Sequence, residues 1–253
     1  MKIAFVYDAV YPCVKGGVEK RVWELAVRLS RRGHDVHLFS MKFWKGKDII
    51  VHEGIWLHGV CPAQRFYTKG RRSLWQPLRF SLYLIRPLLR EKFDIMDCQQ
   101  FPYFSCMSAG FVSKIKKIPF TITWIEVWGD FWLEYLGKKG LLGKLIERYI
   151  ARFSCPTIAI SQFTANRFQC TFHKPVNTII SVGIEFGKIN SVSPSLEQSD
   201  IIFAGRLIKE KNADLLVHAV SLVLPEYPEL RVLLVGERPK KKKNSELYQT
   251  KKS

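Results

Sequence analysis

The fold of this chain is decided by residues 2–40, KIAFVYDAVYPCVKGGVEKRVWELAVRLSRRGHDVHLFS. The stretch opens with a short apolar run at residues 3–7, which predicts a buried strand. From Gly17, apolar residues recur at helical spacing until Gly33, and glycine commonly ends helices. A second apolar run at residues 36–40 predicts another strand. Strand, helix and strand in this order predict the first unit of a parallel α/β sheet.

The same alternation continues to about residue 182. We expect further strands at residues 55–60, 93–98, 119–125, 156–160 and 178–182, and helices at residues 73–91 and 141–153. In the second of these helices the apolar residues fall on one face: Leu142, Leu145, Ile146, Tyr149 and Ile150. The pattern predicts a mostly parallel sheet with both faces covered by helices. Ligands of such sheets bind at the carboxyl ends of the strands.

A second, smaller unit follows a polar segment. Residues 190–199 contain Pro194 and four serines, which indicates a linker. Strands at residues 201–204 and 231–235 flank a helix at residues 212–224, and the pattern then stops in a lysine-rich tail. Two strands and one helix cannot bury the faces of a sheet, so we expect this unit to be incomplete.

The sequence therefore predicts four segments. They are an N-terminal Rossmann-like domain at 1–189, a linker at 190–199, the start of a C-terminal Rossmann-like domain at 200–238, and a disordered tail at 239–253.

The formal net charge of +18 predicts an anionic partner. Nucleic acid, anionic lipid and phosphorylated ligands all fit such a field. No recognisable nucleic-acid-binding module accompanies the charge, so we do not expect nucleic acid. A basic stretch that includes Arg79, Arg86 and Arg90 among leucines could lie on a membrane surface, or form a helix packed on the sheet.

The sequence also bears on location. Six cysteines without a C-x-x-C pair fit a reducing compartment. The N-terminus lacks the features of a signal peptide, and no run reaches the roughly 18 apolar residues of a spanning helix. We therefore expect a cytoplasmic protein, with peripheral binding at the inner face of a membrane as the further option.

Two stretches that follow strands are suited to phosphate. Gly16 and Gly17 open a helix, where glycine lets a ligand approach and the helix end favours negative charge. The alternative interpretation of Gly16 and Gly17 is a turn that needs positive φ. The spacing is not G-x-G-x-x-G, so we do not expect a dinucleotide cofactor. Arg206 and Lys211 stand between a strand and a helix and offer donors for phosphate oxygens. The alternative interpretation of Arg206 and Lys211 is a charged loop that is exposed to solvent.

Two carboxylates are candidates for catalysis. Glu126 lies in residues 123–132, where three tryptophans and two carboxylates follow a strand. Aromatic rings can flank a sugar, and a carboxylate can orient or deprotonate a hydroxyl. The alternative is core packing, with Asp130 as a helix cap. Asp97 lies at the end of the strand predicted at 93–98 and is expected on the same side of the sheet. The six histidines show no metal-ligand spacing, so we expect no metal.

Taken in order, these motifs resemble the family 4 glycosyltransferases. The matching residues are 16–19, 24–26, 32–36, 159–161, 182–185, 203–207 with 210–211, and 235–237. The resemblance implies the GT-B architecture and a retaining sugar transfer from a nucleotide-diphosphate sugar, usually without a metal and without a separate cofactor. The acceptor would be a glycan, a lipid or a small molecule.

The resemblance also implies roles for single residues. Arg206 and Lys211 would hold the donor diphosphate, where positive charge stabilises the leaving group. Gly16 and Gly17 would lie against the donor or acceptor in the interdomain cleft. Glu237 belongs to the last matching piece and is a further donor-binding candidate.

The sequence departs from the family in two places. The family often has a histidine after the strand that ends here at Ile125, and Glu126 would have to substitute for it. The family's paired glutamates lie beyond Gly236, where this chain becomes lysine-rich. A frameshift or an early stop would explain this truncation. The alternative function is a non-catalytic basic module that binds a membrane surface or phosphorylated ligands.

Overall fold

The computed structural model describes residues 1–63, 67–68, 71–72, 75–196, 198–205, 207–208 and 211–236. The chain divides into two compact units, Met1–Ile184 and a second unit that begins at Glu185. The sequence placed this boundary after residue 189. The short helix α7 (Phe186–Asn190), which the sequence did not predict, therefore belongs to the second unit.

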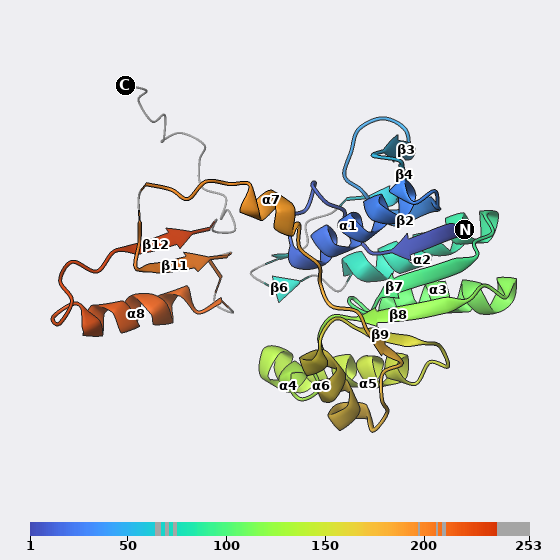
Figure 1. Cartoon of the computed structure of the whole chain (residues 1–253). Coiled ribbons are helices and arrows are strands. Elements are labelled where there is room, and N and C mark those ends of the chain that lie inside the picture. Colours follow the sequence, from blue (N-terminus) through green and yellow to red (C-terminus); the bar gives the residue numbers. More distant parts are fainter. Residues whose placement is uncertain are drawn as a thin grey trace. The chain divides into compact units, whose positions relative to one another are not determined.

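The N-terminal unit is built on an eight-stranded sheet with the order β10-β9-β8-β7-β1-β2-β4-β3 (Figure 1). Its strands are β1 (Lys2–Val6), β2 (Asp35–Lys42), β3 (Ile49–His52), β4 (Ile55–Pro62), β7 (Ile95–Gln99), β8 (Phe120–Trp124), β9 (Thr157–Ala159) and β10 (Thr178–Ile179). All neighbouring pairs are parallel except β3 and β4. The predicted parallel sheet is confirmed.

The antiparallel edge strand β3 was not predicted. It joins β4 through Glu53 and Gly54, and both residues have positive φ, 49° and 77°. Two consecutive residues of this kind form the tight turn that connects hairpin strands. A further two-stranded antiparallel pair comprises β5 (Tyr67–Thr68) and β6 (Arg71–Arg72).

Helices cover both faces of the sheet. They are α1 (Gly17–Arg31), α2 (Trp75–Arg90), α3 (Phe104–Lys116), α4 (Phe131–Leu136), the 3-10 turn Gly137–Lys139, α5 (Gly140–Ala151) and α6 (Gln162–Phe172). Helix α1 ends as predicted, with Gly33 in the left-handed region at φ 84°. The sequence missed α3, α4 and α6. In α3 small polar residues such as Ser105 and Ser108 are buried beside apolar ones, so the helix has no clear polar face.

Strand β1 separates two apolar layers because successive side chains of a strand point to opposite faces. Ile3 and Phe5 pack with residues of α1, while Ala4 and Val6 pack with residues of α2, α3 and α5. The first layer includes Val22, Trp23 and Ala26 of α1, and the second includes Phe80 and Leu84 of α2, Cys106 and Ala109 of α3, and Ile150 of α5. A parallel sheet needs this cover on both faces.

Helix α5 buries a different face from the apolar face that the sequence predicted. Leu142, Leu145 and Tyr149 are each more than half exposed, while Glu147 and Ile150 are buried. The helix is rotated because Glu147 is held inside the unit by three hydrogen bonds, described below.

The C-terminal unit contains β11 (Ile201–Ala204), α8 (Ala213–Val223) and β12 (Val232–Val235), with the two strands parallel. Of its described residues, none is buried. Ile202, Leu215 and Leu222 are more than 60% exposed. This agrees with the expectation that two strands and one helix leave apolar faces uncovered. Across the described parts of both units, no helix is long and apolar enough to cross a membrane.

Two buried histidines lie side by side in the N-terminal sheet. His37 of β2 and His58 of β4 are each 4% exposed, and His37 Nδ1 lies 2.8 Å from His58 Nε2. Burial lowers the pKa of both imidazoles. The charge of the neighbouring His37 lowers the pKa of His58 further, to about 4.

The free energy of unfolding should therefore depend on pH below neutrality. The unfolded chain takes up protons on these histidines near pH 6.5, while the folded chain resists protonation of His58 down to about pH 4. Stability should be full above pH 6.5 and should fall toward pH 4, by at most about 1.4 kcal/mol per pH unit for each histidine. Urea unfolding across this range measures it. The variant His58→Gln should flatten the curve, and the exposed His218→Gln should not.

Candidate active site

The strand order creates a switch point between β1 and β7. From β1 the chain passes through α1 to β2 on one side, and α2 later leads it to β7 on the other side. Loops leaving the carboxyl ends of two such strands diverge, and this is where parallel α/β sheets bind ligands. The N-terminus of α1 and the residues after β7 and β8 gather around this edge (Figure 1).

The first feature of this edge is the N-terminus of α1. Gly16 is the cap residue, with extended backbone at φ −161°, and as a glycine it offers no capping side chain of its own. Neither Gly16 nor Gly17 has positive φ, so a left-handed turn does not explain them. A Cβ on Gly17 would meet no atom within 4 Å, and one on Gly16 would meet the movable side chain of Glu19. Backbone N–H groups at such an end are available to an anion.

The second feature is Gln100, directly after β7. Its buried amide bridges to the loop after β8: Oε1 accepts from the backbone N–H of Ile125 at 3.0 Å, and Nε2 donates to the carbonyl of Glu126 at 3.1 Å. On the other side, Thr164 Oγ1 donates to the carbonyl of Ile125 at 3.1 Å. Ser161 caps α6 by accepting from the backbone N–H of Thr164. Three strand ends are thus tied together, and the backbone of Glu126 is held in place.

The third feature is Glu147 of α5, which supports the same loop from inside. Its carboxylate accepts from Tyr103 Oη at 2.9 Å and from the backbone N–H groups of Trp128 and Gly129, each at 2.8 Å. Gly129 has φ 53°, which favours glycine. Burial raises the pKa of Tyr103 well above its usual value, and the charge of Glu147 beside it adds to that shift.

The aromatic residues of the loop serve packing. Trp124 and Trp132 are buried, and Trp128 packs against the same apolar layer. The ring of Trp128 stacks on Phe101 with centroids 5.8 Å apart. Asp130 precedes α4 but makes no capping hydrogen bond, because its carboxylate pairs with Lys144. Core packing, the alternative interpretation, therefore accounts for all three tryptophans, and Asp130 occupies the cap position of α4 without a capping hydrogen bond from its side chain.

The two candidate catalytic carboxylates are placed differently. Glu126 follows β8 and its side chain is exposed at the carboxyl edge. Asp97 lies inside β7 rather than at its end, and it is only 9% exposed. The expectation that Asp97 ends the strand is wrong, because β7 continues to Gln99.

Asp97 is held within a polar layer of the sheet. Its oxygens accept from Thr123 Oγ1 at 2.8 Å, Thr121 Oγ1 at 2.9 Å and Gln99 Nε2 at 2.8 Å. Burial raises the pKa of Asp97, and the threonine hydrogen bonds and the charge of Arg21 oppose that shift. Burial also lowers the pKa of Arg21. These contacts indicate that the buried Asp97 stabilises the sheet and does not present its carboxylate to solvent.

The C-terminal unit carries the remaining predicted residues. Arg206 and Glu237 lie outside the described residues. Lys211 is exposed just before α8, which begins after Asn212. A Cβ on Gly236 would lie 1.8 Å from the carbonyl oxygen of Gly205, so the ends of β11 and β12 approach too closely for any other residue there.

The N-terminal unit matches a known family over nearly its whole length. The model of Glycosyltransferase Family 4 matches residues 15–186, more than half of the chain. The chain belongs to glycosyltransferase family 4. The matched segment begins one residue before Gly16 and includes Gln100, Glu126 and Glu147. By its description, this family comprises glycosyltransferases.

Relatives and solved structures agree with this family. The chain is 22% identical over 262 residues to a phosphatidylinositol N-acetylglucosaminyltransferase subunit of Arabidopsis thaliana, a match that covers 95% of this chain and 53% of that protein. Sucrose-phosphate synthase of Thermosynechococcus elongatus aligns with a TM-score of 0.65 at 15% identity, over 93% of this chain and 70% of that one. Anabaena HepE in complex with UDP aligns with a TM-score of 0.60 at 17% identity, over 94% and 62%.

These structural likenesses establish the GT-B type of fold: a Rossmann-like N-terminal unit followed by part of a second α/β unit. The chain spans about half the length of the curated relatives it matches.

The sequence analysis missed Gln100 and Glu147. A glutamine pair directly after an apolar strand was a usable signal for Gln100. Glu147 had no such signal, because it lies next to Ile146 on a helix whose apolar stripe pointed elsewhere. Its partners are 18 to 44 residues away in the chain, and only folding brings them together.

Replacing Gln100 by leucine should destabilise the N-terminal unit. The variant Gln100→Leu keeps most of the side-chain volume but leaves the N–H of Ile125 and the carbonyl of Glu126 without their partner. We expect a loss of about 1–3 kcal/mol in the free energy of unfolding, measured by urea titration. Gln162→Leu is the matched control, because Gln162 is exposed and bonds to Asn166 on its own helix. Equal stability of the two variants would contradict the bridging role.

Proposed function

We propose that this chain acts on a nucleotide-diphosphate sugar and transfers its sugar to a glycan or lipid-linked acceptor. The observation that carries the proposal is the N-terminus of α1 beside the switch point of the sheet, where the cap residue Gly16 has no side chain and Gly17 has open space around it. A diphosphate is the anion that such an end favours. Family membership and the UDP complex of HepE, a protein of similar fold, support the same donor class.

The proposed roles follow from charge and exposure. In the N-terminal unit, the helix end of α1 binds the diphosphate and stabilises the charge that develops on it as the sugar leaves. In the C-terminal unit, Lys211 and Arg206 are the cations that we propose for binding phosphate oxygens. The exposed carboxylate of Glu126, on a backbone held by Gln100, orients the acceptor hydroxyl. We propose no metal and no separate cofactor for this step, because fixed cations and the helix end supply the positive charge.

The variant Gly17→Ala tests the ligand-facing role of the helix end. The added methyl meets no atom of the chain within 4 Å, so the melting temperature should be unchanged or slightly higher. If a diphosphate approaches this backbone, the affinity for UDP should fall by about tenfold, roughly 1.4 kcal/mol. Isothermal titration calorimetry with UDP, GDP and ADP measures this directly.

The matched control is Gly187→Ala in α7, another helical glycine with no neighbour within 4 Å of its added Cβ. It should leave both stability and affinity unchanged. If Gly17→Ala behaves as this control does, α1 is not the diphosphate site. If none of the three nucleotides binds to the wild-type chain, the proposed donor class is wrong.

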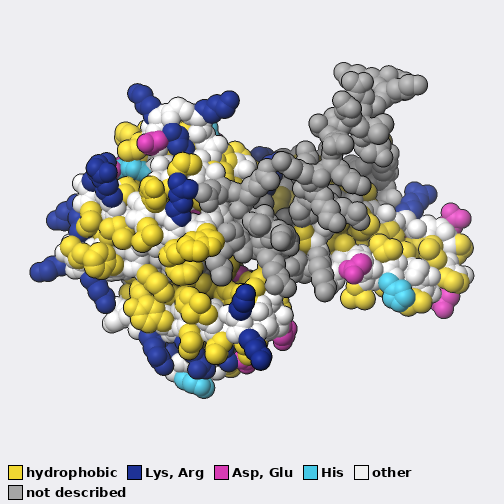
Figure 2. Space-filling view, turned by 180° about the vertical axis from the view of Figure 1, so that it is seen from behind, with side chains coloured by type: hydrophobic (Ala, Val, Ile, Leu, Met, Phe, Trp, Pro, Cys, Tyr) yellow, Lys and Arg dark blue, Asp and Glu magenta, His cyan; other side chains and the backbone are white. Residues whose placement is uncertain are grey.

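A second candidate function is peripheral binding to an anionic membrane, at the cytoplasmic face. The helices that cover one face of the sheet each expose large apolar side chains: Leu82, Tyr83 and Leu89 of α2, Phe111 and Ile115 of α3, and Leu141, Leu142, Leu145 and Tyr149 of α5. Viewed from behind, the N-terminal unit shows hydrophobic side chains gathered between Lys and Arg side chains (Figure 2).

The charges on these helices favour an anionic surface. Helices α2 and α3 contain no acidic residue, and the single acid of α5, Glu147, is buried. Exposed cations such as Arg86, Arg90 and Lys114 stand among the apolar side chains. Apolar insertion combined with basic residues is the pattern of proteins that lie on anionic lipid.

Flotation with vesicles separates this candidate from a simple packing role. Wild-type protein should float with phosphatidylserine-containing vesicles and much less with phosphatidylcholine alone. The double variant Leu142→Ser/Leu145→Ser should lower binding more than about tenfold, because two apolar side chains no longer insert. Leu215→Ser/Leu222→Ser on α8 is the control with similar exposure. Equal losses in both variants, or no flotation of the wild type, would remove the membrane candidate.

A further inference from the structure

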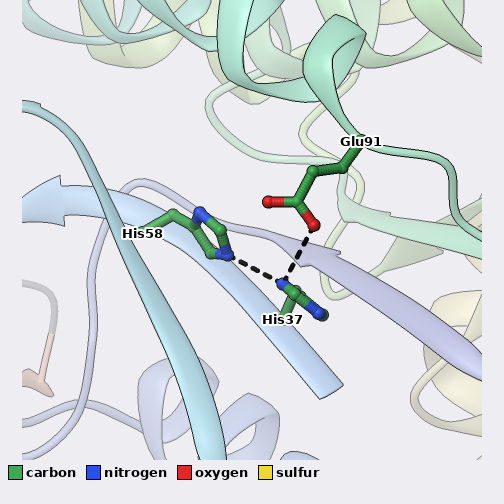
Figure 3. Close-up of side chains that lie close together, drawn as sticks. All are labelled: His37, His58 and Glu91. Carbon is green, nitrogen blue, oxygen red and sulfur yellow. Dashed lines mark hydrogen bonds and ion pairs between the residues drawn. The ribbon is translucent and has the colours of Figure 1, made fainter. Parts of the chain in front are cut away.

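At the amino half of the N-terminal sheet, away from the α1 end, three potential metal ligands converge. His37 comes from β2, His58 from β4, and Glu91 follows directly on α2. In the parallel register His37 is paired with Trp56 and Phe39 with His58, so the two histidines are diagonal neighbours on one face of the sheet. The close-up shows all three side chains turned toward one another (Figure 3).

The distances between these atoms suit a small divalent ion. His37 Nδ1 lies 2.8 Å from His58 Nε2 and 3.8 Å from Glu91 Oε2, and the three ligand atoms lie within 4.8 Å of one another. Ligands of a tetrahedral Zn²⁺ at bond lengths of about 2.0–2.1 Å are roughly 3.3 Å apart. The two shorter spacings lie about 0.5 Å on either side of that value, so small side-chain rotations would bring them to it.

The surroundings match those of bound zinc in two further ways. His37 Nε2, the nitrogen that faces away from the cluster, lies 3.2 Å from Asp35 Oδ2 without hydrogen-bond geometry, and a small rotation would let this carboxylate orient the imidazole as carboxylates orient metal-binding histidines. The cluster also opens into a cavity of about 360 Å³, which Ile49 and Trp56 line as well. Three protein ligands with room for a water as the fourth are a recurring zinc arrangement.

We propose that His37, His58 and Glu91 form a binding site for a zinc-class divalent cation. The ion joins β2, β4 and the connection from α2 to β7, and it stabilises the folded N-terminal unit. Two imidazoles and one carboxylate favour Zn²⁺ over Mg²⁺ or Ca²⁺, which prefer oxygen ligands. The proposal is independent of sugar transfer, because the cluster is at the opposite half of the strands from the candidate active site.

The ammonium group of the neighbouring Lys2 opposes cation binding, so removing it should change the metal affinity in the opposite direction to removing a ligand. Lys2 Nζ lies 2.6 Å from Glu91 Oε2, so a bound cation must compete with this ammonium for the carboxylate. Removing the Lys2 charge should strengthen metal binding, whereas removing a ligand should weaken it. A site that exists only by chance proximity would not respond in both directions.

The experiment is a Zn²⁺ titration of the tag-free, chelator-treated chain by calorimetry, with the melting temperature followed in parallel. We expect one ion per chain, and a rise in melting temperature that a chelator reverses. Glu91→Gln and His58→Gln should each weaken binding at least about tenfold. Lys2→Met should tighten it. His218→Gln, an exposed histidine in the C-terminal unit, should change nothing.

Two controls keep the result decisive. The exposed thiols of Cys13 and Cys170 can bind zinc, so the titration is repeated with both changed to serine. Co²⁺ then reports the ligands, because thiolates add a near-ultraviolet charge-transfer band that imidazole and carboxylate do not. Circular dichroism of each metal-free variant shows whether it folds. Absent binding by the wild-type chain, or binding that folded Glu91→Gln and His58→Gln retain, overturns the proposal.

Discussion

The position of β1 at the centre of the sheet is the constraint on which the candidate sites depend. Strand β1 pairs in parallel with β2 on one side and with β7 on the other, so the order of strands along the chain changes direction at β1. Its alternating side chains also anchor both apolar layers, with Ile3 and Phe5 on one face and Ala4 and Val6 on the other. Because the two neighbouring strands are reached through helices on opposite faces, their connecting loops diverge and leave the carboxyl edge open to a ligand.

The open edge is made rigid by side chains that bond to backbone groups. Gln100 and Thr164 hold Ile125 from two sides, and Glu147 holds the backbone of Trp128 and Gly129. Parallel strands cannot hydrogen-bond beyond their ends, so the loops that follow need such partners to keep one conformation. An exposed residue such as Glu126 can then be presented at a defined place without being buried itself.

The two halves of the same sheet carry different chemistry. The carboxyl half presents a helix end that begins with two glycines, whereas the amino half gathers imidazoles, carboxylates and an ammonium around a cavity. The sheet unit also buries Asp97 and Arg21, whose opposite charges interact electrostatically. Because Asp97 is saturated by hydroxyl and amide donors, it adds order to the sheet without adding an exposed reactive group.

The sequence by itself determined the alternation of strands and helices, the parallel sheet, the small second unit and the resemblance to the family. These follow from local periodicity and from short motifs at strand ends, which need no knowledge of distant contacts. Tertiary structure decided what periodicity cannot encode. The rotation of α5 depends on Glu147, whose partners are far along the chain, and the burial of Asp97 depends on where β7 ends. The histidine cluster arises because sheet register sets residues 21 positions apart side by side.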